Sequence, residues 1–336
     1  MPSFSCKLVA VVAAVSVTAC SNPPDDPVWQ RLDLPAAAGA ELRDVADCGD
    51  RWLVAGARHD ATGGTQPAAW TSTDGHTWQP LPFAPLPASY YGPRQVITSV
   101  ACADGRVAMV GAVPGGAHGN PRVSTWRLDG GRMVENAAPF ETYGGDSAVD
   151  VGPIAAGPDG FAIAGNRTSG AAAWTSPGFA LREGRAGKGT LARDVVALPD
   201  GRWAVAGGVP AGLDERAAFW ILPGFDPAFP PAASGFNEIQ RVVRQGDDVV
   251  AAGARGTAFG LWRWHAGAWS VGATFGGDPG GVRSLAVAGD RLVVAGGGGL
   301  WMDGRSVPAP GDPVAVAGRG TTLLLASADG LWRTQV

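Results

Sequence analysis

The sequence predicts an all-β chain folded as a seven-bladed β-propeller with four-stranded antiparallel blades, because one unit recurs seven times along 336 residues. Each unit has an apolar strand ending on Ala-Gly or a close variant, an Asp-Gly or Gly-Asp type of turn before it, and a tryptophan on the strand after it. The 51 glycines and 27 prolines suit strands joined by tight turns rather than helices. Four-stranded units of about forty residues are typical of propeller blades.

The repeat can be followed by its strands and its tryptophans. The seven apolar strands are 51–56, 106–111, 161–165, 202–207, 249–253, 291–296 and 322–327. The tryptophans that follow them are Trp70, Trp126, Trp174, Trp220, Trp262, Trp301 and Trp332. The strand before each turn, such as 44–46 or 285–287, carries Val and Ala on both faces, as an innermost strand wedged between two blades requires. The repeat runs unbroken through the midpoint, which argues against two domains.

The two ends of the chain are expected to close the ring together. The last unit stops at 332–336 and has no residues left for its fourth strand. Residues 28–35 have the pattern of a fourth strand, with Trp29-Gln30 matching Trp78-Gln79. We therefore expect this N-terminal strand to pair with the C-terminal blade, which removes an exposed sheet edge and ties down both ends.

The first twenty residues have the pattern of an export signal. Lys7 precedes an apolar run at 8–17, which is too short to span a membrane as a helix, and the run ends at Val17-Thr18-Ala19-Cys20. This site resembles the lipobox of bacterial lipoproteins, and the resemblance implies that Cys20 is lipidated and becomes the mature N-terminus. The alternative is an ordinary signal peptide with an incidental cysteine.

The lipobox resemblance leads to an expected domain order and location. We expect a signal peptide at 1–19, a lipidated cysteine and flexible tether at 20–27, and the propeller at 28–336. The chain would then be exported and lipid-anchored at the outer face of the bacterial cell membrane.

Two cysteines remain in the expected mature domain, Cys48 and Cys102. An exported protein meets an oxidising compartment, which favours a disulfide. Aligned on the turn, these cysteines fall within one position of each other at the ends of successive innermost strands. We therefore predict a Cys48–Cys102 disulfide; the alternative is two buried free thiols.

One hairpin adds a second family resemblance. Residues 72–78, Ser-Thr-Asp-Gly-His-Thr-Trp, resemble the Asp-box of sialidase-like propellers, Ser-x-Asp-x-Gly-x-Thr-Trp, but lack one residue between Asp and Gly. The resemblance covers one blade clearly, with a shorter echo at 174–176. It implies that Asp74 caps the turn and Trp78 packs into the blade, away from any substrate. The motif therefore indicates fold rather than activity.

Signals for catalysis, metal binding and nucleic-acid binding are missing from the sequence. The chain has three tyrosines and no arginine cluster that aligns with the sialidase triad. The four histidines lack metal-ligand spacing, and the glycine run at 296–299 opens no helix. A net charge of −4 gives no basic surface for nucleic acid. We predict no catalytic residue, no metal and no cofactor.

Loop residues and a polar ring are the candidate binding groups. The connections 83–95, 139–147 and 223–237 are expected as irregular loops on one common face, where exposed aromatic residues on a rigid scaffold are candidates for binding. The candidate ligand-face residues are Tyr90, Tyr91, Arg94, Tyr143, Asp146, Phe236 and Asn237. The alternative is that the aromatic residues pack the blade ends. A ring at the mouth of the axial channel, which could seat a small polar ligand or ordered water, comprises Asp44, Ser99, Asp194, Arg241 and Ser284.

These observations favour a non-catalytic binding or scaffold module over an enzyme. We expect a membrane-tethered monomer that binds an extracytoplasmic protein or glycan through its loop-rich face. The alternative is a sialidase-like exo-glycoside hydrolase, which would need two facing carboxylates and an arginine cluster in the axial pocket.

Overall fold

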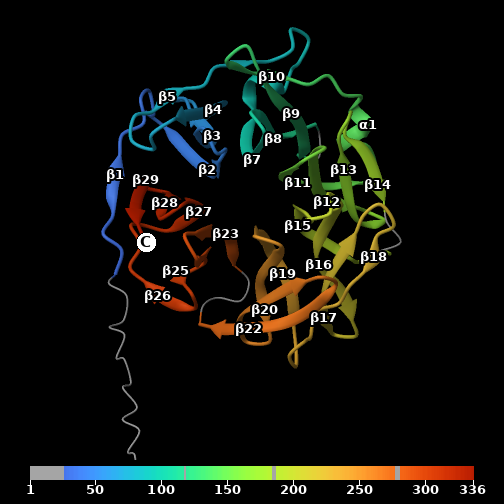
Figure 1. Ribbon diagram of the computed structural model, residues 1–336. Coiled ribbons are helices and arrows are strands. Elements are labelled where there is room, and N and C mark those ends of the chain that lie inside the picture. The colour runs from blue at the N-terminus through green and yellow to red at the C-terminus, as the bar shows by residue number, and fades with distance from the viewer. Residues whose placement is uncertain (1–25, 117–118, 184–186, 277–280) are drawn as a thin grey trace, which may run out of the picture.

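The structure is a closed ring of seven β-sheets around a central axis (Figure 1). It is a computed structural model that describes residues 26–116, 119–183, 187–276 and 281–336. The predicted lipobox and Cys20 lie outside the described residues. Within the described part of the chain, no helix is long and apolar enough to cross a membrane. The all-β, seven-bladed fold class is confirmed.

The first three blades follow one another along the chain, each built from the axis outward. Blade 1 contains β2 (Ala40–Asp47), β3 (Trp52–His59), β4 (Thr65–Ser72) and β5 (Gln79–Pro80). Blade 2 contains β7 (Val96–Ala103), β8 (Arg106–Gly115), β9 (Asn120–Asp129) and β10 (Arg132–Glu135), with a short extra strand β6 (Phe83–Ala84) parallel to β10. Blade 3 contains β11 (Ala148–Gly157), β12 (Gly160–Arg167), β13 (Gly170–Thr175) and β14 (Ala180–Glu183).

The remaining four blades repeat the same antiparallel order. Blade 4 contains β15 (Leu191–Ala197), β16 (Trp203–Ala211), β17 (Asp214–Ile221) and β18 (Asp226–Pro227). Blade 5 contains β19 (Asn237–Gln245), β20 (Asp248–Arg255), β21 (Ala258–His265) and β22 (Ala268–Phe275). Blade 6 contains β23 (Val282–Ala288), β24 (Arg291–Gly296), β25 (Gly299–Met302) and β26 (Arg305–Val307). Blade 7 contains β27 (Pro313–Arg319), β28 (Thr322–Ser327), β29 (Gly330–Gln335) and β1 (Gln30–Leu32).

The expected ring closure by the N-terminus is confirmed. Strand β1 pairs antiparallel with β29, with Gln30 opposite Arg333 and Leu32 opposite Leu331. Just before β1, the indole Nε1 of Trp29 donates a hydrogen bond of 2.9 Å to the carbonyl oxygen of Pro308, which follows β26 in the connection from blade 6 to blade 7. The seventh blade is therefore completed by the opposite end of the chain (Figure 1).

The apolar core is divided among the interfaces between blades. The seven tryptophans of the repeat all lie on third strands, and five of them, on blades 1 to 5, are almost fully buried. Each apolar cluster of the described residues joins two neighbouring blades, including the cluster that joins blade 7 to blade 1. A blade thus buries both of its faces only when it has a neighbour on each side, as a closed ring provides.

The Ala-Gly ending of the second strand has a steric cause in the first strand. Every innermost strand shifts its pairing register at least once, for example between Leu42 and Asp44 in β2 and between Ala192 and Asp194 in β15. The strand bends at this bulge, and a backbone carbonyl presses against the glycine. A Cβ atom at Gly207 would lie 1.8 Å from the Leu191 carbonyl oxygen. A Cβ atom therefore does not fit opposite the bulge of β15, whereas in blade 7 Ser327 stands at the corresponding position, opposite Pro313.

The predicted disulfide is confirmed between blades 1 and 2. Cys48, just after β2, is bonded to Cys102 near the end of β7, with 5.3 Å between their Cα atoms. The bond joins successive innermost strands at the same end of the axis.

The hairpin at 72–78 is held by Asp74. Its Oδ1 atom accepts the backbone N–H groups of His76 at 2.8 Å and Thr77 at 2.7 Å, and these bonds hold the pKa of Asp74 well below its usual range. Trp78 is buried in the blade. Asp74 therefore caps its turn as the sequence suggested.

Candidate functional site

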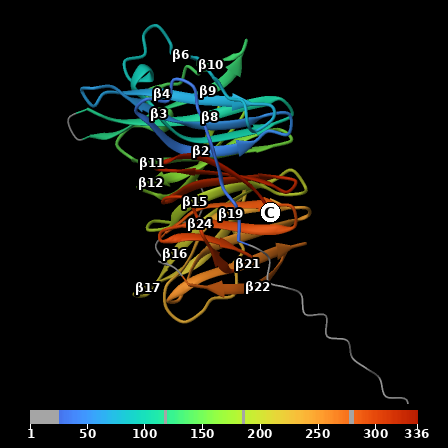
Figure 2. The same cartoon turned by 90° about the vertical axis from the view of Figure 1, so that its left-hand side faces the viewer.

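The two faces of the ring carry different connections. Because the strands of a blade alternate in direction, the turns between first and second strands and between third and fourth strands lie on one face, here called the turn face. The second-to-third hairpins and the connections between blades lie on the opposite face, here called the loop face. In Figure 2, turned by 90°, the strands run across the picture between these two faces.

A cavity of about 580 Å³ lies among the loop-face connections that enter and leave blade 2. One wall is the connection from blade 1, which contains the short 3-10 helix η1 (Gly92–Arg94). The other wall contains α1 (Phe140–Tyr143), one helical turn in the connection to blade 3, where the sequence predicted an irregular loop. We call this space the aromatic cavity, after Tyr90, Tyr91, Phe140 and Tyr143 in its lining.

Glu135 holds the first wall in place. At the end of β10, its Oε1 atom accepts hydrogen bonds from the hydroxyl groups of Ser89 at 2.8 Å and Ser124 at 2.7 Å. Its Oε2 atom accepts the backbone N–H of Leu86 at 3.0 Å. The buried Glu135 carboxylate is thus fully engaged in joining the loop to the strand, which gives it a structural role.

The second wall is fixed by its contacts with blade 3. The indole Nε1 of Trp174 donates to the carbonyl oxygen of Thr142 at 2.6 Å, and the Tyr143 ring packs 5.9 Å from the Trp174 ring. The buried Tyr143 hydroxyl lies 3.4 Å from Thr125 Oγ1. Burial raises the pKa of Tyr143 to about 12. This phenol stays protonated at neutral pH and forms the floor of the cavity.

The rim of the aromatic cavity is exposed and carries cations. Tyr90 is 65% exposed and Phe140 is 56% exposed. The Arg94 guanidinium lies 4.2 Å over the Tyr90 ring, and that of Arg122 lies 4.9 Å from the Phe140 ring and 5.9 Å from the Tyr91 ring. The Arg122 guanidinium has no hydrogen-bond or ion-pair partner among the residues that the structure describes. The rim therefore offers flat apolar surfaces next to an unpaired positive charge.

Only some of the predicted ligand-face residues lie together at the aromatic cavity. Tyr90, Tyr91 and Tyr143 line the aromatic cavity, and Arg94 stacks at its edge. Asp146 is exposed but lies outside the lining, in the turn after α1. The prediction did not include Arg122, which sits within strand β9 and has no loop signature in the sequence.

Two further members of the predicted face belong to blade 5. Phe236 is 40% exposed, and it precedes β19 far from the aromatic cavity (Figure 1). Asn237 is 1% exposed, and its side chain bonds the backbone N–H and carbonyl of Ala233 and the carbonyl of Gly235. Asn237 therefore holds its own loop together and presents no surface to a ligand.

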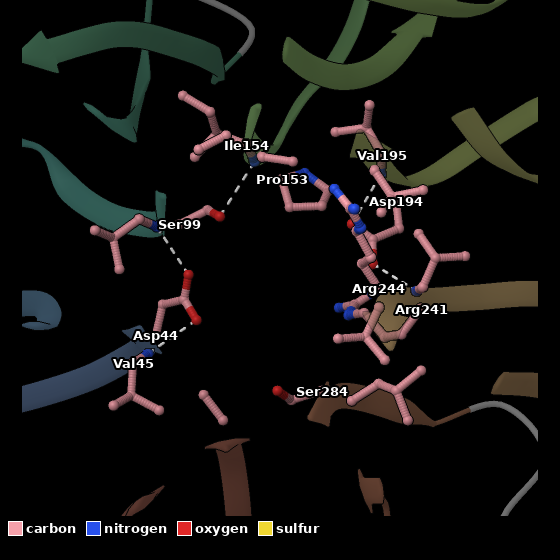
Figure 3. Close-up of a pocket in the computed structure, with 18 of the residues that line it drawn as sticks. Asp44, Val45, Ser99, Pro153, Ile154, Asp194, Val195, Arg241, Arg244 and Ser284 are labelled. Atoms are coloured by element: carbon pink, nitrogen blue, oxygen red, sulfur yellow. Dashed lines mark hydrogen bonds between the residues drawn. The ribbon is translucent and has the colours of Figure 1, made fainter. Parts of the chain in front are cut away.

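The predicted polar ring is assembled in one place. All five of its residues line a cavity of about 740 Å³ on the axis, here called the axial cavity (Figure 3). They come from the innermost strands, each directly after its bulge. Figure 3 shows Asp44 and Ser99 on one side, with Asp194 and Arg241 on the other.

The two aspartates of the ring connect neighbouring blades. Asp44 Oδ2 accepts the backbone N–H of Val100 on β7 at 2.8 Å, and Asp194 Oδ2 accepts that of Val242 on β19 at 2.9 Å. The Oδ1 atom of each accepts the N–H of the next residue on its own strand. Burial raises the pKa of both carboxyls to about 6, against the effect of these hydrogen bonds.

The serines of the ring act in the same way. Ser99 Oγ accepts the N–H of Ile154 on β11 at 3.2 Å, and Ser284 Oγ accepts that of Val316 on β27 at 3.1 Å. Arg241, at the same position on β19, donates its Nε–H to the carbonyl oxygen of Arg283 on β23. The position after the bulge thus joins adjacent blades at five of the seven interfaces. These side chains therefore have a structural role in joining the blades, because each carboxylate oxygen already accepts one backbone N–H. In the described residues, no group of three or more potential ligands could hold a metal ion.

Comparison with known proteins gives the fold alone. No family model matches the chain, and no curated protein matches it. Among solved structures, a virginiamycin B lyase from Staphylococcus aureus superposes with a TM-score of 0.61 at 13% identity, covering 93% of this chain and 100% of that one. YCF48 bound to a D1 peptide gives 0.57 at 13% identity over 94% and 96% of the chains. A chain of the mitotic checkpoint complex gives 0.59 at 13% identity over 100% and 99%. A likeness at this level of identity agrees with the geometry above: the chain is a seven-bladed β-propeller.

Proposed function

We propose that this propeller is a non-catalytic binding module that captures an extracytoplasmic protein or glycan in the aromatic cavity on its loop face. The observation that carries the proposal is the convergence of Tyr90, Tyr91, Phe140 and the unpaired Arg122 from three separate stretches of the chain. Exposed aromatic rings and arginine are the side chains most enriched at binding hot spots. Structural neighbours include a propeller bound to a peptide and one within a protein complex, which supports a binding role.

The direction of β1 is compatible with a membrane tether. As the fourth strand of blade 7, β1 begins at Gln30 on the turn face and runs toward the loop face. A lipid on Cys20 would therefore pull from the turn face and leave the aromatic cavity facing away from the membrane. We propose this arrangement for a monomer exported to the outer face of the cell membrane. Replacing Cys20 by serine should move the protein from the membrane fraction to the soluble fraction.

Binding is tested by presenting the purified protein to a glycan array and to an immobilised peptide library. Y90A and F140A should each weaken capture of the selected ligand by about tenfold, a typical effect at a hot spot. F236A is the matched control, because Phe236 is an exposed loop-face aromatic outside the cavity. Equal binding by the wild type, Y90A and F140A would contradict the proposal.

The glycoside hydrolase alternative requires a different result. The purified protein is incubated with a panel of chromogenic glycosides, and no turnover is expected. Turnover that a single carboxylate substitution abolishes would overturn the non-catalytic assignment.

A further inference from the structure

The axial cavity opens on the opposite face from the aromatic cavity. Its lining extends from the bulges, at Arg43 and Pro153, to the first turns of the blades, at Asp104 and Pro158. It therefore occupies the turn-face half of the axis. Any ligand bound there is separate from one held on the loop face.

Four arginines line the axial cavity, and their pairing differs. Arg43 forms an ion pair with Glu41, and Arg283 forms one with Asp312 at 2.6 Å. Arg241 and Arg244 have no carboxylate within ion-pair distance among the described residues. These two guanidinium groups lie on one side of the cavity in Figure 3.

The Arg241 side chain is held in place by backbone carbonyls. Its Nε donates to the carbonyl oxygen of Arg283 and its Nη1 donates to that of Gln240, both at 2.6 Å. The Nε of Arg244 donates to the carbonyl oxygen of Gly246 at 2.8 Å. The Nη2 group of Arg241 and both amino groups of Arg244 have no partner among the described residues. Arg241 is held by two bonds, whereas Arg244 is exposed and held by one bond within its own turn. A guanidinium group that is held in place and has unused donors binds oxyanions well, because little side-chain entropy is lost.

The aspartates in the cavity do not use these donors. Both oxygens of Asp44 and of Asp194 accept backbone N–H groups, so their charges offset those of the arginines without binding them. A cavity that is nearly neutral but rich in free N–H donors selects a ligand by hydrogen-bond geometry. Arginine forks match the paired oxygens of carboxylate and phosphate groups.

We propose that the axial cavity is a second binding site, independent of the aromatic cavity, for a small oxyanion bearing a carboxylate or phosphate group, held by Arg241 and Arg244. The oxyanion can be free in solution or be the headgroup of an anionic phospholipid. Both present the same oxygens to the same donors.

Titration calorimetry of the purified protein with citrate and with inorganic phosphate tests for a free anion, and co-sedimentation with phosphatidylglycerol vesicles tests for a headgroup. R244Q should weaken binding about tenfold, as expected for the loss of one charge-assisted hydrogen bond. R132Q is the charge-matched control, because Arg132 is exposed on β10 away from both cavities. R244Q loses a single backbone contact, so its folding, checked by circular dichroism, should be preserved.

Either arm supports the proposal if R244Q loses binding and R132Q keeps it. The absence of binding to both anions and to the vesicles, or equal losses in R244Q and R132Q, would overturn it. The Y90A variant should bind these anions normally, which separates failure of this site from failure of the loop-face site.

Discussion

Removal of the Cys48–Cys102 bond should reveal how much the ring depends on its covalent link between blades 1 and 2. The bond closes a segment with a sequence separation of 54 residues. In the chain-entropy model, opening such a loop lowers the free energy of unfolding by about 4 kcal/mol. The unfolding entropy of a chain of about 300 residues converts this loss into a fall in Tm of about 6 °C.

The assay is differential scanning calorimetry of the wild type and the C48S/C102S variant, each with and without reductant. Reductant should lower the Tm of the wild type to that of the variant and leave the variant unchanged. A variant that melts within 1 °C of the oxidised wild type (about a sixth of the expected shift) would show that the reasoning is wrong. The native contacts between β2 and β7 would then define the junction without help from the bond.

Three further predictions follow from the ring geometry. In urea unfolding, G207A should lower the free energy of unfolding by about 3 kcal/mol or more, because the new Cβ would meet the rigid carbonyl of Leu191. The control variant G212A, where no atom lies near the new Cβ, should lower it by about 1 kcal/mol. Equal losses in the two variants would refute the steric explanation. Burial raises the pKa of Asp194 from 3.8 to about 6, so the folded state holds this proton more tightly than the unfolded state does. This carboxyl alone should lower the free energy of unfolding by about 2 kcal/mol as the pH rises from 4 to 7. The fall measured for D194N should be smaller than that of the wild type by this amount, the rest coming from groups such as Asp44, and an equal fall in both proteins would contradict the assignment. A chain that begins at Pro35 lacks β1 and should expose β29 to rapid amide hydrogen exchange, and unchanged protection of β29 would contradict ring closure.

Much of the fold could be predicted because the same sequence pattern recurs in each blade. The Ala-Gly ending and the tryptophan on the following strand recur in the sequence. The glycine meets a carbonyl of its own blade, and the tryptophan packs at the same interface with the preceding blade in each repeat. The closing strand was predictable because Trp29-Gln30 repeats Trp78-Gln79. The disulfide followed from the register of two successive units, which places Cys48 and Cys102 at the same end of the axis.

The sites were less accessible to sequence reasoning because they depend on contacts between units. Alignment of the repeats correctly placed the five residues of the polar ring around one cavity. The hydrogen bonds from these residues to the next blade, however, are visible only in the three-dimensional structure. Asn237 was predicted as a ligand residue from its place in a loop, but its side-chain amide hydrogen-bonds to the backbone of that same loop. Arg122 was missed because a strand residue gives no sign that two loop aromatics, Tyr91 and Phe140, will flank it.

Hydrogen–deuterium exchange of the purified protein, with and without the ligand selected on the arrays, tests the central claim most directly. The account predicts slowed exchange in the two walls of the aromatic cavity, at 86–94 and 139–144, and no change on the turn face. Protection confined to blades 4 to 6, or to the first turns around the axis, would contradict the assignment of the loop-face cavity as the binding site.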